Sequence, residues 1–313
     1  MERTLTHNVG PEWDGARLDT LLRTGYKMSG SLIKELKRLP DGLLINALHA
    51  KTTDTLRSGD TVTITMREEA SEHIAPVKLP FGMIYEDEDI LIADKPSGMP
   101  THISQGNYDN TLSNAVMYYF TQKGEDCVFR AVNRLDKDTS GLLCIAKNKY
   151  IHARLCADFG AKAVSRKYLA IVCGHIGDGV VDAPIGRSGE SVIKREVTGE
   201  GARAVTHYRT LRTFGGFSLV ELRLETGRTH QIRVHMAHLG APLLGDWLYG
   251  EENKELFKRT ALHSYYLSLT HPLTGERLEF TSGLPKDMDD FIVSQSPGGT
   301  APESGPCACE TGL

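Results

Sequence analysis

Residues 204–226, AVTHYRTLRTFGGFSLVELRLET, contain two runs rich in β-branched, aromatic and aliphatic residues, separated by a Gly-Gly turn. Such runs are typical of β-strands, and glycines are typical of the turns between them. The same pattern recurs in both directions along the chain. We expect further strands within DILIADKP, GLLCIAKN, KYLAIVCGHI, YYLSLTHP and RLEFTSG.

Predicted helices are fewer than predicted strands. Apolar spacing indicates them within TLSNAVMYYFTQ, YIHARLCADFG and THQIRVHMAHLG. Many strands with Gly, Asn and Pro turns, and only a few helices, predict an α+β fold with a mixed, largely antiparallel sheet and flanking helices. The length of 313 residues corresponds to about two domains.

A small module is predicted to precede this region, within residues 15–65. Ser31 is the expected N-cap of a helix in SLIKELKRL. Its apolar stripe would consist of Leu32, Ile33, Leu36 and Leu39. The cations expected to share one face of this helix are Lys34, Lys37 and Arg38. Alternation of Val62, Ile64 and Met66 predicts a half-buried strand. A basic helix beside a small sheet suits RNA phosphates, although an ordinary amphipathic helix has the same pattern.

Composition shifts place the domain boundaries. We assign residues 1–70 to the small module, 71–80 to a charged linker with prolines, and 81–293 to the main domain. Residues 294–313 are rich in Pro, Gly and Ser and are expected to be a disordered tail. The six cysteines lack the spacing of a zinc site or a disulfide framework, so we expect reduced thiols.

The overall composition excludes several classes of protein. Hydrophobic residues make up 40% of the chain and charged residues 24%, which argues against a wholly disordered or fibrous protein. No apolar run approaches the roughly 18–20 residues that cross a bilayer. The first twenty residues lack the apolar stretch of a secretion signal. We therefore expect a cytoplasmic protein without membrane contact.

Positive charge is concentrated in the middle of the chain. The net charge is −4, but residues 287–313 carry five acids and no Lys or Arg, so the rest carries +1. Residues 128–238 contain 18 Lys and Arg against 10 Asp and Glu, a net charge of +8. A basic middle region favours a polyanionic partner, and a solvated basic face is the alternative.

The densest group of reactive side chains is NRLDKDTSG, residues 133–141. Two acids, two bases and two hydroxyls lie in a predicted turn between apolar segments. Loops held by strands are where catalytic groups concentrate. The same residue types also occur in a well-capped polar turn, which is the structural alternative.

A second polar stretch, ETGRTHQIRVH (225–235), places Arg228 and Arg233 around a turn and the start of a segment. Two arginines in such a place can clamp an anion or nucleic acid. An arginine within about 4–6 Å of Asp136 would lower the pKa of that carboxyl and keep it ionised.

Metal and nucleotide sites have weaker support. His230, His235 and His238 with Asp246 offer a possible ligand set, yet no His-Glu-x-x-His pattern is present. No phosphate-binding loop or nucleophile elbow occurs, and the glycines at 174, 177 and 179 differ from a dinucleotide fingerprint. We predict neither a metal nor a nucleotide cofactor.

NRLDKDTSGLL resembles the signature of the RluA group of pseudouridine synthases, which isomerise uridine in RNA, chiefly ribosomal RNA. The stretches DKPSGMPTH (94–102), RKYLAIVCG (166–174), ETGRTHQIRVHMAHLGAPLLGDWLYG (225–250) and ALHSYYLSLTHPLTGE (261–276) resemble further blocks of that group in the same order. Together they span about residues 81–285. Residues 15–65 are similar, more loosely, to the S4-type RNA-binding module that often precedes this domain.

The resemblance implies roles for individual residues. Asp136 matches the essential aspartate, and Arg134 matches the arginine that helps to hold the target base out of the stack. Tyr168 matches the tyrosine that packs on the uracil ring, and Arg233 the basic residue that pairs with the aspartate. Asn133 departs from the group, in which many members have His.

The implied activity is conversion of uridine to pseudouridine in ribosomal large-subunit RNA, with tRNA as another possible substrate. It implies no cofactor and a monomer. Two other functions stay open from the residues alone. One is a non-catalytic RNA-binding ribosome assembly factor, and the other is a metal hydrolase built on the histidines near Asp246.

Overall fold

The computed structural model describes residues 2–68, 74–161, 163–189, 191 and 193–296. The chain divides into two compact units, and its path passes between them several times. Unit 1 consists of Met1–Lys137, Gly141–Val164 and Ser268–Phe280. Unit 2 consists of Asp138–Ser140, Ser165–Leu267 and Thr281–Leu313, of which residues 297–313 lie outside the described part.

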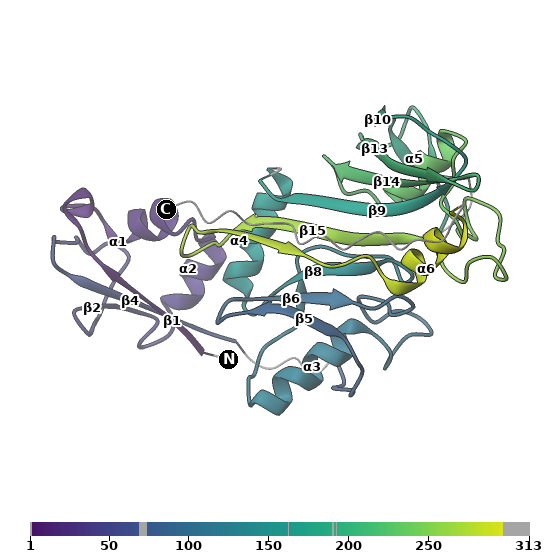
Figure 1. Ribbon diagram of the computed structural model, residues 1–313. Coiled ribbons are helices and arrows are strands. Elements are labelled where there is room, and N and C mark those ends of the chain that lie inside the picture. Colours follow the sequence, from purple (N-terminus) through teal and green to yellow (C-terminus); the bar gives the residue numbers. More distant parts are fainter. Residues whose placement is uncertain (1, 69–73, 162, 190, 192, 297–313) are drawn as a thin grey trace, which may run out of the picture. The chain divides into compact units, whose positions relative to one another are not determined.

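Unit 1 begins with a four-stranded antiparallel sheet (Figure 1). Its strand order is β1 (Glu2–Asn8), β4 (Thr61–Arg67), β2 (Leu43–Ile45) and β3 (Leu48–His49). The short helical segments beside it are η1 (Pro11–Trp13), α1 (Leu18–Thr20), η2 (Leu21–Gly25) and α2 (Gly30–Leu36). The side chains of Val62, Ile64 and Met66 are buried, which confirms the alternation predicted for β4.

Helix α2 differs in part from its prediction. The N-cap is Ser29, whose hydroxyl accepts a hydrogen bond from the amide of Leu32 at 3.2 Å, so the assignment of Ser31 was wrong. The helix also ends at Leu36. Lys37 is its C-cap and Arg38 follows in a turn, so the prediction that these cations share a helix face with Lys34 was wrong. The buried stripe of Leu32, Ile33 and Leu36 is confirmed, but Leu39 lies beyond the end of the helix and is half-buried, so its inclusion was wrong.

The remaining part of unit 1 is built on two buried antiparallel strands, β6 (Ile90–Lys95) and β8 (Ser140–Ala146). In unit 1, β5 (Gly82–Glu86) pairs with β6, and β7 (Arg130–Ala131) pairs with β8. Residues 90–93 and 142–146 are fully buried, as expected of near-continuous apolar runs. Residues 268–270 end β15 (Leu262–Thr270) and lead into β16 (Arg277–Thr281).

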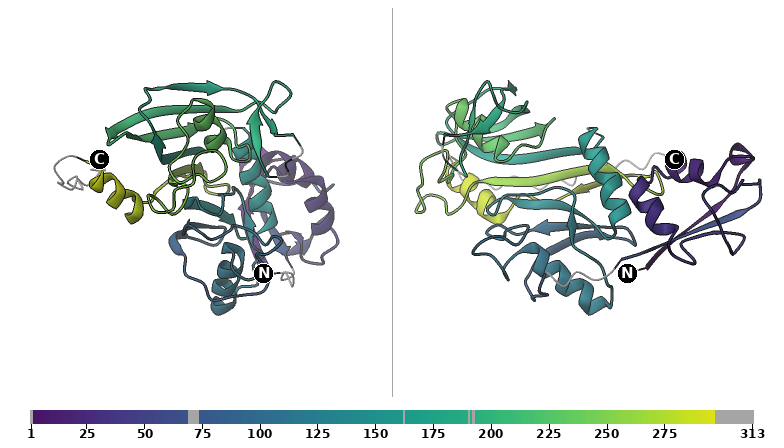
Figure 2. Two further views of the ribbon diagram at one scale, coloured as in Figure 1. Left: turned by 90° about the vertical axis from the view of Figure 1, so that its right-hand side faces the viewer. Right: turned by 180° about the vertical axis from the view of Figure 1, so that it is seen from behind.

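Two helices complete unit 1, α3 (Leu112–Lys123) and α4 (Lys149–Gly160) (Figure 2). Helix α3 begins with a capping box between Thr111 and Asn114. The hydroxyl of Tyr119 donates to Glu86 of β5 at 2.6 Å, which ties the helix to the sheet. Both helices were predicted from their apolar spacing, and both are confirmed.

Unit 2 contains the strands β10 (Gly179–Asp182), β13 (Val205–Phe214), β14 (Phe217–Leu224) and β9 (Ser165–Cys173), in that order, followed by residues 262–267 of β15. The pairings β10–β13, β13–β14 and β14–β9 are antiparallel. A two-stranded ribbon of β11 (Ile185–Arg187) and β12 (Arg195–Val197) and helix α5 (Gln231–His238) complete this part. The prediction of a mostly antiparallel α+β fold with few helices is confirmed.

Helix α6 (Lys286–Ser294), which the sequence patterns did not predict, closes one core of unit 2. Met288, Phe291 and Ile292 are buried against Ile171 of β9 and Phe214 of β13. The helix includes the first residue of the predicted tail, and residues 297–313 of that tail lie outside the described residues. Within the described part, no helix combines the length and apolar character needed to cross a membrane. The domain boundaries at 70 and 81 stay a prediction.

Candidate active site

The loop 133–137 of unit 1 carries Arg134 and Asp136, and the contacts that hold it go mainly to its backbone. The side chain of Asn133 accepts a hydrogen bond from the amide of Cys144 in β8 at 2.9 Å. The buried hydroxyl of Thr101 donates to the carbonyl of Leu135 at 2.9 Å. Because both anchors belong to buried side chains, the loop is fixed at its start and at its middle.

A third anchor is Lys95, the last residue of β6, whose side chain is completely buried. Its ammonium group donates to the carbonyls of Met99 at 2.7 Å, Pro96 at 2.9 Å and Lys137 at 3.1 Å. A buried cation is tolerated when its donors meet acceptors. Lys95 therefore joins the segment after β6 to the backbone directly following Asp136.

The side chains of this loop face a different environment. Arg134 is exposed and Asp136 is partly exposed. His102 lies close enough to Arg134 to be affected by its charge, and its ring meets Phe129 edge-on at 5.4 Å between centroids. Burial lowers the pKa of His102, and the positive charge of Arg134 lowers it further. His102 is therefore neutral at pH 7.

Sequence reasoning singled out DKPSGMPTH but gave no role to Lys95, Thr101 or His102. A lysine at the end of an apolar strand reads as an exposed residue, because lysine is almost never fully buried without acceptors. The signal that pointed to this segment was its resemblance to a block of the family, which does not reveal a hydrogen bond to Lys137.

Unit 2 holds Tyr168, Arg228 and Arg233. Tyr168 lies on β9 opposite Leu222 of β14 and is 5% exposed. The backbone of Tyr168 is held in the antiparallel hydrogen-bond ladder between β9 and β14, and this gives the residue a fixed position in the sheet.

Arg233 lies on α5 and is buried in an ion pair with Asp246. Its Nε and one terminal nitrogen each donate to one carboxylate oxygen at 2.7 Å, which is the bidentate arrangement. The guanidinium group also lies over the ring of Tyr249, with 5.0 Å to the centroid. Asp246 in turn accepts hydrogen bonds from the amides of Leu248 and Tyr249 at 3.0 and 3.1 Å. The prediction that Arg233 serves Asp136 is not tested by these contacts.

The turn before α5 is held by Gln231. Its side-chain nitrogen donates to the carbonyl of Val205 and to the hydroxyl of Thr206, both at 3.0 Å. Its side-chain oxygen accepts from the amide of Arg228 at 3.0 Å. The exposed side chain of Arg228 donates from Nε to the carbonyl of Arg203 at 3.0 Å. A basic group is thereby placed at the surface of a well-braced turn.

The proposed ligand set near Asp246 is not arranged around a metal. The ring of His235 uses both nitrogens, which lie 2.8 Å from the Thr206 hydroxyl and 2.9 Å from the Ala183 carbonyl. The carboxylate of Asp246 is bound to Arg233. Burial lowers the pKa of His235, so it is neutral within the core. The contacts therefore favour a structural role for these groups.

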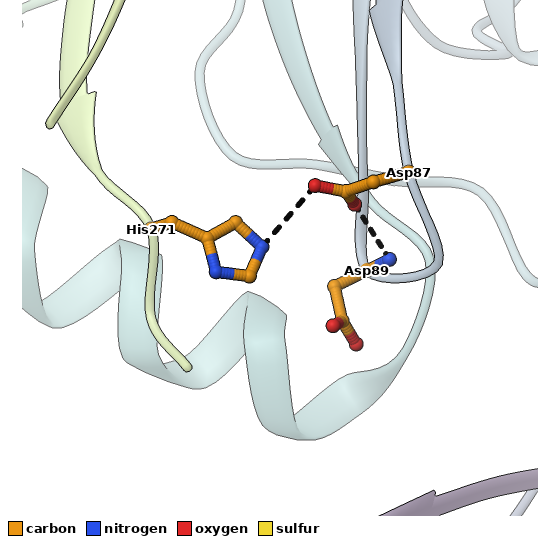
Figure 3. A group of neighbouring side chains, drawn as sticks. All are labelled: Asp87, Asp89 and His271. Atoms are coloured by element: carbon orange, nitrogen blue, oxygen red, sulfur yellow. Dashed lines mark hydrogen bonds and ion pairs between the residues drawn. The ribbon is translucent and has the colours of Figure 1, made fainter. Parts of the chain in front are cut away.

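A different group of possible ligands consists of Asp87, Asp89 and His271 in unit 1 (Figure 3). One oxygen of Asp87 accepts from the amides of Asp89 and Ile90, each at 2.7 Å. The other accepts from the hydroxyl of Tyr85 at 2.7 Å and lies 3.3 Å from Nε2 of His271. Nδ1 of that ring accepts from backbone amides, so Nε2 carries the proton and points to the carboxylate.

The hydrogen bonds of this cluster favour a role in stabilising the fold. Asp89 is occupied by Arg3, which donates to its two oxygens at 3.0 and 2.9 Å. Burial alone would raise the pKa of Asp87, but hydrogen bonds from His271, the two amides and Tyr85 hold it well below its usual range. The hydrogen bond to Asp87 raises the pKa of Tyr85 to about 12. The carboxylates are already satisfied by protein donors.

The predicted RNA-contacting cations of the N-terminal region are all exposed. Lys34, Lys37 and Arg38 have no ion-pair partner among the described residues. They do not line the cavity of about 570 Å³ between α2 and α4. Of the cations that line it, Lys149 pairs with Glu35 and Arg154 donates to the carbonyl of Tyr26 at 2.9 Å, while Lys27 is exposed.

Comparison with known proteins identifies the family. The family model described as RNA pseudouridylate synthase matches residues 89–238, which include Arg134, Asp136, Tyr168, Arg228 and Arg233. A relative from Zymomonas mobilis, named ribosomal large subunit pseudouridine synthase D, is 40% identical over 88% of this chain and 93% of its own length. The chain belongs to the RNA pseudouridine synthase family. It is an RNA pseudouridine synthase by class, and the non-catalytic alternative is not favoured.

Other matches agree with this assignment of the synthase. A Bacillus subtilis protein named uncharacterized RNA pseudouridine synthase YlyB is 43% identical over 80% of this chain and 84% of its own length. The solved structure of human RNA pseudouridylate synthase domain containing 1 matches with a TM-score of 0.55 and 29% identity, over 69% of this chain and 86% of that chain. The resemblance drawn from the sequence motifs is confirmed.

Proposed function

We propose that this synthase acts on ribosomal large-subunit RNA and that Asp136 is its nucleophile. The observation that carries the assignment of Asp136 is the construction of its loop. Lys95 and Thr101 bind the backbone carbonyls on both sides of the aspartate, and the Asn133 side chain joins the start of the loop to β8. A reacting group needs a fixed backbone, because small displacements of catalytic groups are costly in rate. The name of the Zymomonas relative supports the choice of RNA.

The other roles follow from the family resemblance. We propose that Tyr168 packs on the uracil ring and serves in the final proton step, and that Arg233 supplies positive charge to the aspartate. The buried pair with Asp246 holds the Arg233 guanidinium in one orientation, and its contact to Asp136 stays part of the proposal. Arg134 is proposed to hold the target base out of the stack, and the exposed Arg134 side chain is consistent with contact to RNA.

The N-terminal region is proposed to be an S4-like RNA-binding module. The exposed cations Lys34, Lys37 and Arg38 support it, since none of them has an ion-pair partner among the described residues. Arg228 is proposed as a further contact to RNA from unit 2. Phosphate contacts of this kind give affinity without reading the sequence of the RNA.

The chemistry needs only groups that the chain carries. The N1–C1′ glycosidic bond breaks, the uracil turns, and a new bond forms from C5 to C1′, while C5 loses its hydrogen and N1 gains a proton. The reaction is an isomerisation without redox change or phosphoryl transfer, so we propose that it proceeds without a cofactor. The target must leave its stack, which costs a few kcal/mol and favours loops or weak pairs. The proposal places the protein in the cytoplasm, as a monomer.

The deciding experiment is the release of tritium from C5-labelled uridine. Transcripts of ribosomal RNA and tRNA are incubated with the wild type and with Asp136→Asn, without added metal. We expect release from ribosomal RNA by the wild type, and a loss of at least about 10⁴-fold in the variant, as for other removed nucleophiles. RNA affinity of the variant should be unchanged, because Asn has nearly the same shape.

Two results would contradict the proposal in different ways. Tritium release by the Asp136→Asn variant at the wild-type rate would show that Asp136 is not the nucleophile. Release from tRNA alone would replace the proposed substrate and leave the aspartate in place. A melting temperature equal to that of the wild type must accompany the loss of turnover, so that unfolding does not explain it.

A further inference from the structure

Unit 2 contains a pocket of about 330 Å³ that no proposed role has used. Its lining includes Trp247, Asp138, Lys258 and Arg259. The indole of Trp247 is 51% exposed, although tryptophan is usually mostly buried. A flat aromatic surface open to solvent at the edge of a pocket is a surface on which another ring can stack.

The loop that carries Trp247 is tightly packed on its N-terminal side. Gly245 has a φ of +70°, and a Cβ added there would lie 2.1 Å from the carbonyl oxygen of Arg259. The chain can therefore pass this point only with glycine. Asp246, the next residue, is fully buried in the pair with Arg233. Trp247 is thus exposed while its neighbours on one side are fixed, which keeps the entropy cost of using it for binding low.

The far wall of the pocket is fixed by Arg259. This side chain donates to the carbonyl of Asp138 at 3.2 Å and to both carboxylate oxygens of Asp287 at 2.6 and 2.9 Å. One side of the pocket is therefore two residues from Asp136 in the chain, and Trp247 is the residue after the ion-pair partner of Arg233.

The lining contains three cations, Lys254, Lys258 and Arg259, and two acids, Asp138 and Glu252, and this excess of positive charge favours a nucleotide over a cation. Lys254 pairs with Glu252 at 2.9 Å, and Arg259 is neutralised by Asp287. Lys258 is exposed and has no ion-pair partner among the described residues. One aromatic face beside one available ammonium group suits a base together with its phosphate.

We propose that this pocket binds a base of the RNA strand next to the target uridine, with Trp247 stacked on the base and Lys258 on its phosphate. The inference rests on the proposed function, because the RNA substrate of the synthase is the strand that would occupy this pocket. Stacking accepts any base, so this subsite would set affinity and register along the strand without reading its sequence.

The two tryptophans of the chain give a direct test. In a Trp13→Phe variant, Trp247 is the single source of indole emission. We titrate this variant with fluorescein-labelled ribosomal RNA transcripts and record indole emission together with the anisotropy of the label. The expected result is quenching of Trp247 along the same binding curve as the anisotropy. Saturated binding with unchanged indole emission would overturn the proposal.

Kinetics provide a second measurement. Trp247→Ala should raise KM about tenfold with kcat unchanged, because a contact equally strong in the ground and transition states is lost. Trp247→Phe should restore most of the affinity, and Leu256→Ala, an exposed apolar change nearby in sequence, should leave KM unchanged. Lys258→Ala should reduce the slope of log affinity against log salt by about 0.7. An unchanged KM in Trp247→Ala would contradict the stacking role.

The failure of this inference is distinguishable from the failure of the proposed function. Tritium release with no change in indole emission removes the subsite and leaves the synthase assignment. Loss of kcat in Trp247→Ala with normal KM would show a structural role for the indole instead. Absence of both RNA binding and tritium release in the wild type would overturn both proposals.

Discussion

The turn 87–89 and the loop 133–137 both place acidic side chains beside buried strands of unit 1, yet they are held in opposite ways. In the turn, the carboxylates themselves are the anchors: Asp87 binds two amides, Tyr85 and His271. In the loop, the anchors reach the backbone, from Lys95 to Lys137 and from Thr101 to Leu135. The turn is therefore held through its carboxylates, and the loop is held through backbone carbonyls on both sides of Asp136.

The strongest test of the backbone anchors is Lys95→Met. The variant keeps the length of the side chain but leaves three carbonyl groups, one of them fully buried, without their common donor. We expect a loss of about 3–5 kcal/mol in the free energy of unfolding, as for other disrupted buried charge networks. Urea unfolding followed by circular dichroism measures it. Lys137→Met is the matched control, because its exposed side chain can be exchanged while its carbonyl stays. An equal loss of unfolding free energy in Lys95→Met and Lys137→Met would contradict the conclusion that the loop is held by the Lys95 side chain through backbone carbonyls.

The substitution Asp87→Asn in the turn 87–89 should lower the stability of the fold and leave catalysis unchanged. Asn keeps an acceptor oxygen but loses the charge that His271 and the two amides stabilise. We expect the free energy of unfolding to fall by about 2 kcal/mol, with kcat unchanged at a temperature where the variant is folded. Urea unfolding and tritium release, measured side by side, report the two quantities. Asp126→Asn, at an exposed position of the same unit, should change neither. A fall in kcat would place the turn in the catalytic machinery.

The same comparison predicts a pH dependence. The pKa of Asp87 is depressed in the folded state, so its stabilisation is complete above the unfolded value of about 4 and is lost as the pH falls toward the folded value. The difference between the wild type and Asp87→Asn should therefore be constant from pH 7 to 5 and shrink below about pH 4. Unfolding measured from pH 7 to 3 checks it. A difference that grows as the pH falls would have the wrong sign for a depressed pKa.

The smallest effect is expected for Thr101→Val, which removes one hydroxyl and keeps the shape. The carbonyl of Leu135 loses its donor, at a cost of about 1 kcal/mol in stability. Because this carbonyl belongs to the residue before Asp136, kcat should also fall, by about tenfold. Melting curves and tritium release measure the two effects, and Thr101→Ser should restore both. Unchanged kcat in Thr101→Val would show that the loop is held well enough by Lys95 and Asn133.

Local patterns predicted the elements that bury most of their residues. Strands β6 and β8 were found because their apolar runs are nearly continuous, and helices α3 to α5 because their apolar residues recur at helical spacing. Helix α6 was not predicted, although Met288, Phe291 and Ile292 lie at helical spacing, because the segment is rich in acidic residues and directly precedes the Pro-, Gly- and Ser-rich end of the chain. The short strands β10 to β12 carry few apolar residues, so their pairing depends on partners distant in the sequence.

The sequence by itself determined the family, the class of reaction and the residues proposed to carry it, because motif blocks keep their order and spacing whatever the fold does locally. Only the tertiary structure decided which charged groups hold the molecule together. Ser29 caps α2 where Ser31 was expected, Asp246 binds Arg233, and Lys95 reaches Lys137. Such contacts join residues that are far apart in the chain or equivalent in local pattern, and a hydrogen bond depends on distance and direction in space, which residue types alone do not specify.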